Sequence, residues 1–518
     1  MLTTSKVDIE RAGEILRGGG LVAFPTETVY GLGANAFDEN AVKSIYAAKG
    51  RPSDNPLIVH IARKEDFAPL VKEITPKAQA LIDAFFPAPL TIILPKSDLI
   101  GKTVSGGLGT VAVRMPQNET ARAVIAAAGV PIAAPSANTS GKPSPTSAKY
   151  VLEDMNGRID AVVDGGDCEF GVESTVITLA GDTPVILRPG AVTKEMIEAV
   201  IGRVELSGAV LNRLAENETA ASPGMKYKHY APKARVILVE GAKEDYERFV
   251  NMQKNAAALC FEGDSITVPK VTYGAEGDDL SQSHALFDAL RRLDEIGAQK
   301  VYAHSPSKSG VGIAVYNRLI RAAAFCVLDL NKPFTVGLTG LTGAGKGYVC
   351  KRLAARGFKI ISADEFARKV VENNSLLLAE LAEEFGQDII EGGTLNRALL
   401  AKRAFANKEK TARLNAIMHP AILKMCEAEA QHPCVFDAPQ LFESGADKMC
   451  ARILCVTAPA EQRLRRITQR DGITEQQARE RMGAQLDDGV LQNKSDFVII
   501  NDGREIDCQI DEFINNYI

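Results

Sequence analysis

The segment Phe334–Gly347, which reads FTVGLTGLTGAGKG, has the pattern of a buried strand, a glycine-rich turn and the start of a helix. Glycines let backbone N–H groups approach phosphates closely, and Lys346 adds a mobile positive charge. We therefore predict an α/β unit that begins here and binds nucleotide phosphates at its first helix. The expected contacts come from Gly340, Leu341, Thr342, Gly343, Ala344, Gly345, Lys346 and Gly347. Such loops usually end in a Ser or Thr that holds Mg²⁺, but residue 347 is glycine.

Acidic side chains follow two later strands of the same unit. An apolar segment, 358–361, leads into Asp364, and residues 434–437 form an apolar strand that ends in Asp437. A carboxylate beside a phosphate-binding loop can accept a proton from a substrate hydroxyl or hold Mg²⁺. We predict Asp364 as the general base and both aspartates as metal ligands. The alternative for Asp364 is an exposed turn.

Three arginines, Arg463, Arg466 and Arg470, recur at helical spacing further along the chain. A basic helix face is usually solvated surface. Next to a nucleotide site it also fits a lid that closes arginines over phosphates, which is the interpretation we favour.

Composition limits the class of protein. The 518 residues are enough for three or four domains, 46% are hydrophobic, and the formal net charge of −5 gives no general argument for nucleic-acid binding. The N-terminus lacks an apolar signal segment, and no apolar run is long enough to cross a bilayer, so we expect a cytoplasmic protein. Nine cysteines without a Cys-x-x-Cys pair predict reduced, mostly buried thiols.

The first two hundred residues repeat one arrangement, in which polar residues directly follow an apolar strand. Loops at strand ends are where α/β proteins place ligands. Lys49 and Arg51 either cap a helix dipole or clamp an anion, and His60 is either a core residue or a ligand. Together these segments predict a site for a nucleotide and a small polar substrate. They are Pro25–Gly33, Lys49–Pro52, Asn55–His60, Ser136–Thr146, Gly171–Val176 and Leu187–Gly190.

The motifs KGRP, SAN with its continuation SGKPSPT, ESTV and LRPG resemble those of the YrdC-like threonylcarbamoyl-AMP synthases, over roughly residues 5–205. The resemblance implies a twisted open α/β domain that joins threonine, bicarbonate and ATP into threonylcarbamoyl-AMP and releases pyrophosphate. The product would pass to the machinery that modifies adenosine in tRNA, without a stable nucleic-acid or membrane partner. The implied ATP contacts are Lys49, Arg51, Asn55, Thr110, Ser136, Asn138, Ser144 and Arg188, and the implied threonine contacts are Thr28, His60, Arg114 and Ser174. Lys49 and Arg51 would offset charge on the phosphates during catalysis.

A boundary follows at residues 222–232, a proline-bracketed segment that composition alone would make a solvated linker. It resembles the linker of the longer, two-domain synthases, which folds over the active site as a gate through positions such as Lys226, His229 and Tyr230. Residues 233–330 then alternate strand-like and helix-like segments, which predicts a small parallel α/β accessory domain. Its ending, GVGIAVYNRLIRAAA, also resembles that family, and a lid or regulatory role is a hypothesis.

From residue 334 to 518 the chain resembles dephospho-coenzyme A kinase, through GLTG and GAGK, SADEFAR, LNAIMHP, DAPQLFE, QRDGIT and Asn501-Asp502-Gly503. The resemblance implies transfer of the γ-phosphate of ATP to the 3′-hydroxyl of dephospho-CoA with Mg²⁺, and places Asn501 and Gly503 at the adenine. The departures from the family pattern are Gly347, Tyr348, Ser362, Asn396 and Gln440.

We therefore predict a bifunctional enzyme with a synthase domain at 1–221, a gating linker at 222–232, an accessory domain at 233–330 and a kinase domain at 334–518. Two alternatives remain open. The N-terminal half would be an RNA-binding module in one, and the C-terminal half a degenerate kinase that only binds nucleotide or CoA in the other. Threonine-dependent pyrophosphate release and phosphorylation of dephospho-CoA distinguish them.

Overall fold

The computed structural model describes residues 1–212, 230–372, 374–483 and 487–518. They form two compact units, one made of 1–238 and 253–327 and the other of 239–252 and 328–518. Lys226 and His229 of the predicted gating linker lie outside the described residues. Within the described part of the chain, no helix has the length and apolar character needed to span a membrane.

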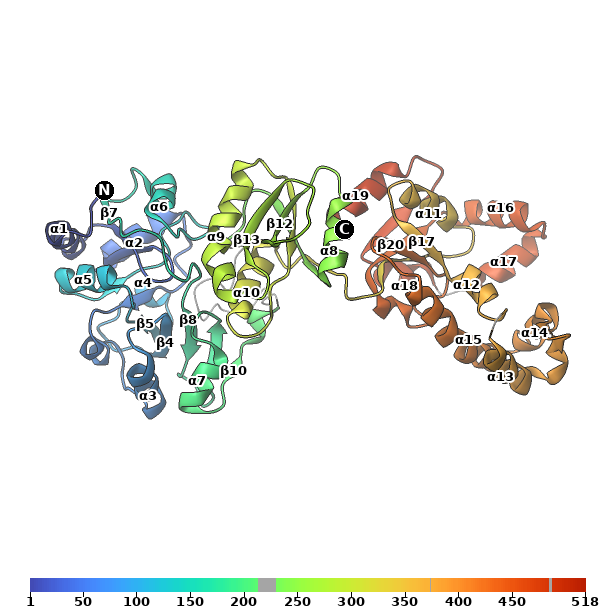
Figure 1. The fold of residues 1–518 in the computed structure, drawn as a ribbon, viewed down its shortest axis with the longest axis horizontal. Coiled ribbons are helices and arrows are strands. Elements are labelled where there is room, and N and C mark those ends of the chain that lie inside the picture. Colours follow the sequence, from blue (N-terminus) through green and yellow to red (C-terminus); the bar gives the residue numbers. More distant parts are fainter. Residues whose placement is uncertain (213–229, 373, 484–486) are drawn as a thin grey trace. The chain divides into compact units, whose positions relative to one another are not determined.

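The N-terminal domain is built on one ten-stranded mixed sheet, in the order β10-β9-β8-β4-β5-β3-β6-β2-β1-β7 (Figure 1). Its strands are β1 (Val22–Phe24), β2 (Gly31–Asn35), β3 (Ile58–His60), β4 (Leu90–Pro95), β5 (Thr110–Arg114), β6 (Ile132–Ala133), β7 (Ala161–Val162), β8 (Thr175–Thr178), β9 (Val185–Arg188) and β10 (Glu205–Leu206). Its helices are α1 (Lys6–Arg17), α2 (Glu39–Lys49), α3 (Pro76–Phe85), α4 (Lys102–Ser105), α5 (Glu119–Ala128), α6 (Ala148–Met155) and α7 (Lys194–Ile201).

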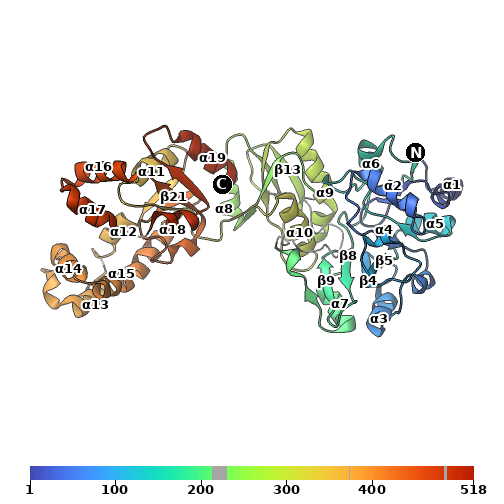
Figure 2. The ribbon, with the colours of Figure 1, turned by 180° about the vertical axis from the view of Figure 1, so that it is seen from behind.

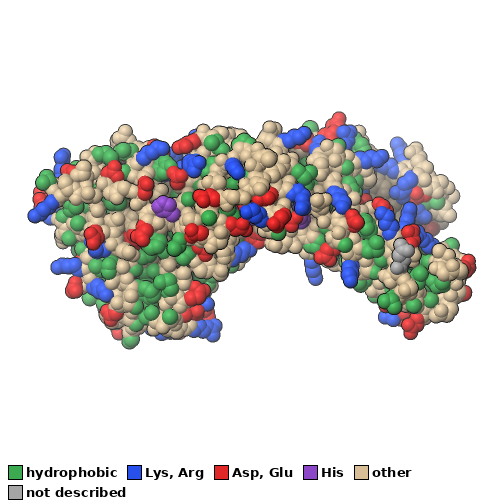
Figure 3. Space-filling model, in the orientation of Figure 1, with side chains coloured by type: hydrophobic (Ala, Val, Ile, Leu, Met, Phe, Trp, Pro, Cys, Tyr) green, Lys and Arg blue, Asp and Glu red, His purple; other side chains and the backbone are tan. Residues whose placement is uncertain are grey.

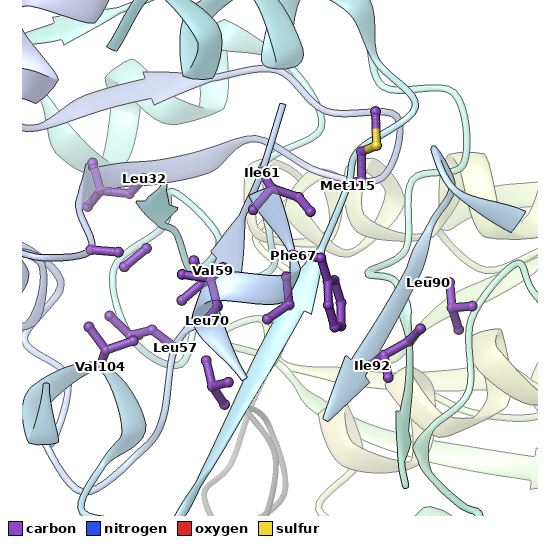
Figure 4. Packing of buried hydrophobic residues seen from close by; sticks show 14 of the residues in the cluster. Leu32, Leu57, Val59, Ile61, Phe67, Leu70, Leu90, Ile92, Val104 and Met115 are labelled. Atoms are coloured by element: carbon purple, nitrogen blue, oxygen red, sulfur yellow. The ribbon is translucent and has the colours of Figure 1, made fainter. Parts of the chain in front are cut away.

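The core of this domain lies where the helices pack on the sheet. Figure 4 shows side chains from β3 and β4, such as Val59 and Ile92, in the same cluster as Phe67 and Leu70 from the segment after β3. These four side chains are fully buried. Burial of apolar surface on this scale holds the sheet rigid and fixes where its strands end.

The accessory domain has a five-stranded sheet in the order β13-β12-β14-β11-β15. Its strands are β11 (Arg235–Glu240), β12 (Ala257–Glu262), β13 (Lys270–Ala275), β14 (Lys300–His304) and β15 (Val327–Asp329), and its helices are α8 (Lys243–Asn251), α9 (Asp279–Glu295) and α10 (Gly312–Ala322). Strand β12 pairs in parallel with β13 and β14, which confirms the predicted parallel arrangement. The sequence analysis did not predict β13 or β15.

The C-terminal sheet is parallel throughout, in the order β17-β20-β16-β21-β22. Its strands are β16 (Phe334–Thr339), β17 (Lys359–Ser362), β20 (Cys434–Asp437), β21 (Cys450–Thr457) and β22 (Phe497–Ile500); a separate hairpin joins β18 (Ile390–Glu391) and β19 (Thr394–Leu395). The helices are α11 (Lys346–Ala354), α12 (Ala363–Lys369), α13 (Ser375–Phe385), α14 (Arg397–Ala404), α15 (Lys408–Ala428), α16 (Ala460–Asp471), α17 (Glu475–Gly483), α18 (Asp488–Asn493) and α19 (Asp507–Tyr517).

Strand β16 is the central strand and is buried along its whole length, because it is covered on both faces. Its first residue, Phe334, stacks on Phe436 of β20 with ring centroids 4.4 Å apart. Helices α11 and α19 lie side by side in both views (Figures 1 and 2), joined by the ion pairs of Arg352 with Asp507 and of Arg356 with Asp511. The strand at the start of Phe334–Gly347 is thus the middle strand of the C-terminal sheet.

Basic and acidic side chains are interspersed on the face that Figure 3 shows. All nine cysteines carry free thiols, and most of them are buried, as expected. The mixed α/β class predicted for the chain is confirmed.

Candidate active sites

The first site begins where α2 ends. Gly50 has φ 61°, a left-handed conformation that stops the helix and turns the chain so that Lys49 and Arg51 both line one pocket. Lys49 Nζ donates to the carbonyl oxygen of Asn138 at 2.6 Å and to that of Ser136. Its charge therefore serves the Ser136–Thr146 loop rather than the last carbonyls of its own helix.

Arg51 is only partly satisfied by protein groups. Its Nη2 donates to the carbonyl oxygen of Pro56 at 3.2 Å, while its buried Nε has no hydrogen-bond partner among the described residues. Buried N–H donors are normally paired, so an unpaired one in a pocket indicates a ligand acceptor. A guanidinium in this state is suited to bind phosphate or carboxylate.

Arg114 lines the same pocket. It donates through Nη2 to Glu27 at 2.7 Å and to the hydroxyl of Thr28 at 3.0 Å, and these three side chains are buried. Its Nε is again buried without a partner in the described part of the chain. Glu27 offsets the buried charge, and the remaining N–H is available to a carboxylate.

His60 is brought to Arg114 by the pairing of β3 with β5, in which the two residues are register partners. It is buried and lines the pocket, so it is both a core residue and a pocket residue. Burial and the neighbouring Arg114 lower the pKa of His60 to about 3. The imidazole is therefore neutral near pH 7 and adds a hydrogen-bonding group without charge.

Most predicted residues of this site meet in one pocket. Those that line it are Lys49, Arg51, His60, Arg114, Ser136, Asn138, Arg188 and Tyr230. Three others lie directly behind it: Thr28 bonds to Arg114, Ser144 to Glu173, and Ser174 to Arg188. Asn55 is buried beside Arg51, and Thr110 begins β5, but neither lines the pocket.

The sequence analysis missed an acidic side chain in this pocket, Glu173. It belongs to the quoted ESTV motif, where only Ser174 was assigned a role. Glu173 is buried and accepts a hydrogen bond from the hydroxyl of Ser144 at 2.7 Å. The available signal was a carboxylate at the start of a buried strand, within a motif otherwise expected to bind an anion. Thr26, Ser140 and Lys142 also line the pocket; they lie in segments predicted to form the site but were not assigned individual roles.

The second site is built around the glycine-rich loop after β16. Gly343 and Gly345 have φ angles of 80° and 99°, and a Cβ on either would lie within 3 Å of Arg463 or Asn501. Only glycine suits these positions. Lys346 begins α11, and its Nζ donates to the carbonyl oxygen of Gly340 at 3.1 Å. The loop thus has the conformation that the sequence predicted for phosphate binding.

The three predicted lid arginines differ in position. Arg463 is buried and donates through Nε to the carbonyl oxygen of Thr342 at 3.0 Å, leaving Nη2 buried and unpaired among the described residues. Arg466 donates to the carbonyl oxygens of Gly343 and Ala344, both at 3.2 Å. Arg470 instead pairs on the surface with Asp471.

The two residues predicted to contact adenine, Asn501 and Gly503, differ in burial. Asn501 is buried and donates through Nδ2 to the carbonyl oxygen of Ala344 at 2.8 Å, so in this structure it braces the phosphate-binding loop. Gly503 lies in an exposed turn with φ 96°.

Asp364 and Asp437 lie at the carboxyl edge of the same sheet. Asp437 is the register partner of Leu338 on β16 and of Ser362 on β17, two residues before Asp364. Burial raises the pKa of Asp437, Lys346 opposes this shift, and the negative charge of Asp364 adds to it. Its Oδ1 is buried and has no partner in the described part of the chain. A buried carboxylate whose pKa is raised by a neighbouring carboxylate is a natural place for a cation.

Asp364 is exposed, as the alternative supposed, but it lies on the first turn of α12 and lines a pocket of about 320 Å³. The pocket is lined mostly by apolar residues of α15 and of the segment after β20, with Asn415, His419 and Gln440 among its polar groups. An acceptor molecule in it would lie against Asp364.

Comparisons with known proteins match both parts of the chain. A family model described as "Telomere recombination" matches residues 14–190, one described as "Threonylcarbamoyl-AMP synthase, C-terminal domain" matches residues 192–324, and one described as "Dephospho-CoA kinase" matches residues 334–507.

Individual relatives agree with these matches. The threonylcarbamoyl-AMP synthase of Pyrococcus abyssi is 48% identical over 329 residues, which are 62% of this chain and 96% of that protein. The corresponding protein of Bacillus subtilis is 46% identical over 330 residues, 62% of this chain and 94% of its own length. The dephospho-CoA kinase of Corynebacterium glutamicum is 43% identical over 176 residues, 32% of this chain and 88% of its own length.

Among solved structures, the crystal structure of P. abyssi Sua5 complexed with L-threonine superposes with a TM-score of 0.60 at 46% identity. The match covers 63% of this chain and 97% of that one.

Proposed function

The chain belongs to the threonylcarbamoyl-AMP synthase family over residues 14–190 and 192–324 and to the dephospho-CoA kinase family over residues 334–507, and from this we propose roles for its two sites. The protein is a bifunctional enzyme, a nucleotidyltransferase of tRNA modification and a phosphotransferase of coenzyme A biosynthesis. We propose the boundaries 1–221, 222–232, 233–330 and 334–518 for its synthase, linker, accessory and kinase parts.

In the synthase, Arg51, Lys49 and Arg188 receive the phosphates of ATP, and Arg114 receives the carboxylate of threonine beside Thr28 and His60. The observation that supports this assignment is that Arg51 and Arg114 line one pocket and that each has a buried Nε without a partner in the described structure. The threonine amine and bicarbonate form a carbamate with loss of water, a carbamate oxygen attacks the α-phosphorus of ATP, and pyrophosphate leaves. Cations held in place offset the charge that accumulates on the leaving group.

The test is pyrophosphate release from ATP by the full-length chain, with threonine and bicarbonate supplied together and separately. Release that requires both supports the synthase. ATP binding without release, combined with tight RNA binding, would support the RNA-binding alternative instead. The product would pass to the machinery that transfers the threonylcarbamoyl group to tRNA, and we expect both activities in the cytoplasm.

In the kinase, Asp364 accepts the proton of the 3′-hydroxyl of dephospho-CoA, which occupies the pocket beside α12 and α15. The hydroxyl oxygen attacks the γ-phosphorus of ATP, and ADP leaves. Lys346, the loop N–H groups and the free Nη2 of Arg463 stabilise charge on the transferred group. The observation that supports this proposal is that Asp364 lines that pocket and lies two residues beyond Ser362, the register partner of Asp437.

The residues present fit a magnesium ion. Mg²⁺ favours oxygen ligands and is usually held by one or two carboxylates together with substrate phosphates and water. Asp437 offers a buried, unpaired oxygen within the described structure, and Asp364 lies close enough to influence its pKa. When bound there, the ion would neutralise charge between the outer phosphates. Gly347 provides no hydroxyl, so the protein's contribution to the site falls to the aspartates.

Replacing Gly347 by serine should therefore speed phosphate transfer at limiting Mg²⁺. A Cβ on Gly347 meets no atom within 4 Å, so the serine fits without rearrangement. We expect about a tenfold gain in kcat/KM at low Mg²⁺, comparable to one hydrogen bond to a charged group, and a much smaller gain at saturation.

Gly347→Ala is the matched control, because it raises the helix propensity of α11 by about 1 kcal/mol without adding an oxygen. The rate is measured for the three proteins as a function of Mg²⁺. Equal rates for serine and alanine at every concentration would contradict a missing metal ligand.

A further inference from the structure

Helix α10 of the accessory domain carries an arginine into the wall of the synthase site. Arg318 is fully buried. Its Nε donates to Glu173 Oε2 at 3.0 Å and its Nη2 to the carbonyl oxygen of Glu173 at 3.0 Å. Its Nη1 donates to the carbonyl oxygen of Pro189 at 2.5 Å. One side chain thus contacts two of the motifs that form the site, ESTV and LRPG.

Glu173 extends this contact to a third motif. Its Oε1 accepts the hydrogen bond of the Ser144 hydroxyl, so the guanidinium, the carboxylate and the hydroxyl form a continuous chain. Glu173 also lines the pocket, together with Lys49 and Arg188. A bare carboxylate in a pocket for a polyphosphate would repel the substrate, and in a buried site that repulsion is weakly screened. The arginine both orients and neutralises it.

A second arginine of the accessory domain, Arg291 of α9, contacts the Ser136–Thr146 loop that carries Ser144. Helices α9 and α10 both lie beside β8 in the two views (Figures 1 and 2). Arg291 donates to the carbonyl oxygen of Pro143 at 2.6 Å and to Asp154 at 3.0 Å. Asp154 in turn pairs with Lys142 at 2.8 Å. The segment that carries Ser144 is therefore linked to the accessory domain twice, directly from Pro143 to Arg291 and through Glu173 to Arg318.

We propose that Arg318 is a positioning residue of the synthase, by which the accessory domain completes the ATP site through Glu173 and Ser144. The inference rests on the synthase activity proposed above and assigns the accessory domain a part in it. Within the synthase domain, Arg188 offsets part of the charge of Glu173, and the accessory domain supplies the cation that is hydrogen-bonded to it.

The charges around Glu173 make this role measurable. The carboxylate is faced by Arg318 from α10, Arg188 from β9 and Lys49 from α2, and by the Tyr230 side chain. Burial alone would raise the pKa of Glu173, but Arg318 and Arg188 hold it below its usual value. Without Arg318, burial is opposed by fewer charges, and the pKa of Glu173 is expected to rise. Acidic pH would then protonate Glu173 and relieve part of the defect.

The experiment compares Arg318→Met with Arg321→Met in the full-length chain. Arg321 lies one turn further along α10, is also buried, and donates to the carbonyl oxygen of Ala209 at 2.8 Å, so its loss removes a contact between the domains while the bonds described for Glu173 stay in place. We expect Arg318→Met to lower kcat/KM for ATP in the synthase reaction about a hundredfold, and Arg321→Met less than about fivefold. Kinase activity of the same molecules reports the concentration of folded chain.

Two further readouts separate positioning from general support of the fold. Adding Glu173→Gln to Arg318→Met should raise kcat/KM for ATP at least about tenfold above that of Arg318→Met alone, because the unpaired negative charge is removed. The defect of Arg318→Met alone should shrink between pH 8 and pH 6, while that of Arg321→Met stays constant. Equal defects in the two single variants, or no recovery with Glu173→Gln, would overturn the inference.

A wild-type chain that releases no pyrophosphate would instead count against the synthase activity. In that case the inference is tested by measuring ATP affinity of the same variants with titration calorimetry. Affinity that is lost in Arg318→Met and regained when Glu173→Gln is added supports the inference. Unchanged affinity overturns it.

Discussion

Replacing Asp364 by asparagine is expected to lower kcat for phosphorylation of dephospho-CoA about a thousandfold, the range lost when a positioned proton acceptor is removed. The substitution keeps the shape of the side chain and removes its ability to take a proton. Since we propose that ATP binds through the loop after β16, KM for ATP should change less than about threefold. Initial rates at saturating ATP and varied dephospho-CoA measure the effect.

Glu365→Gln is the matched control. Glu365 is the next residue on the same exposed helix, and it pairs with Lys369 at 2.7 Å on the surface. Its loss should leave the kinase rate unchanged, because surface ion pairs contribute little. An Asp364→Asn protein that keeps more than a tenth of the wild-type rate would remove Asp364 from the role of base. A wild-type chain that binds ATP and dephospho-CoA without turnover would favour the degenerate-kinase alternative.

Replacing Arg51 by alanine is expected to lower kcat/KM for ATP in pyrophosphate release by about a hundredfold to a thousandfold, the range found when one fixed charge-stabilising group is removed. Its buried Nε is unpaired in the described structure, so the substitution leaves no protein acceptor stranded at that atom. The loss should appear in catalysis rather than in folding. Arg51→Lys should fall between wild type and alanine, because lysine keeps the charge but loses the fork.

Arg63→Ala supplies the comparison for Arg51→Ala. Arg63 pairs with Asp66, and 74% of its side chain is exposed, so neither activity should change. Kinase activity in the Arg51→Ala chain should equal that of wild type, which separates a local loss from misfolding. If Arg51→Ala and Arg63→Ala release pyrophosphate equally fast, Arg51 is not part of the ATP site.

Local patterns predicted much of both sites because the signals that form them are local. Gly343 and Gly345 are required by positive φ angles within one turn, so the loop geometry follows from a few adjacent residues. Lys49 and Arg51 are placed by Gly50 at the end of α2, three residues in succession. His60 and Arg114 each stand at the end of a strand, where α/β sheets gather their ligands.

Other contacts join residues that are far apart in the sequence, and no local sequence pattern predicts them. Arg463 and Arg466 were predicted as a lid from helical spacing, yet they bind loop carbonyls more than a hundred residues earlier. Arg318 stands in a largely apolar helical segment, where the nearby Asn317 and Arg321 are polar as well, so nothing local marks it as part of a site. Its partner Glu173 is 145 residues away, and only the packing of α10 against the synthase domain brings them together.

The sequence alone determined that two enzymes are joined in this chain and that the segment Phe334–Gly347 begins the second, and it predicted a nucleotide site at the strand ends of each. These conclusions rest on short runs of residues whose backbone conformation is set by their neighbours. The tertiary structure decided which charges meet: Arg318 with Glu173, Arg114 with Glu27, and Asp437 beside Asp364. Electrostatic interactions act across space and are strongest where water is excluded, so they are decided by how distant elements pack, which local sequence does not specify.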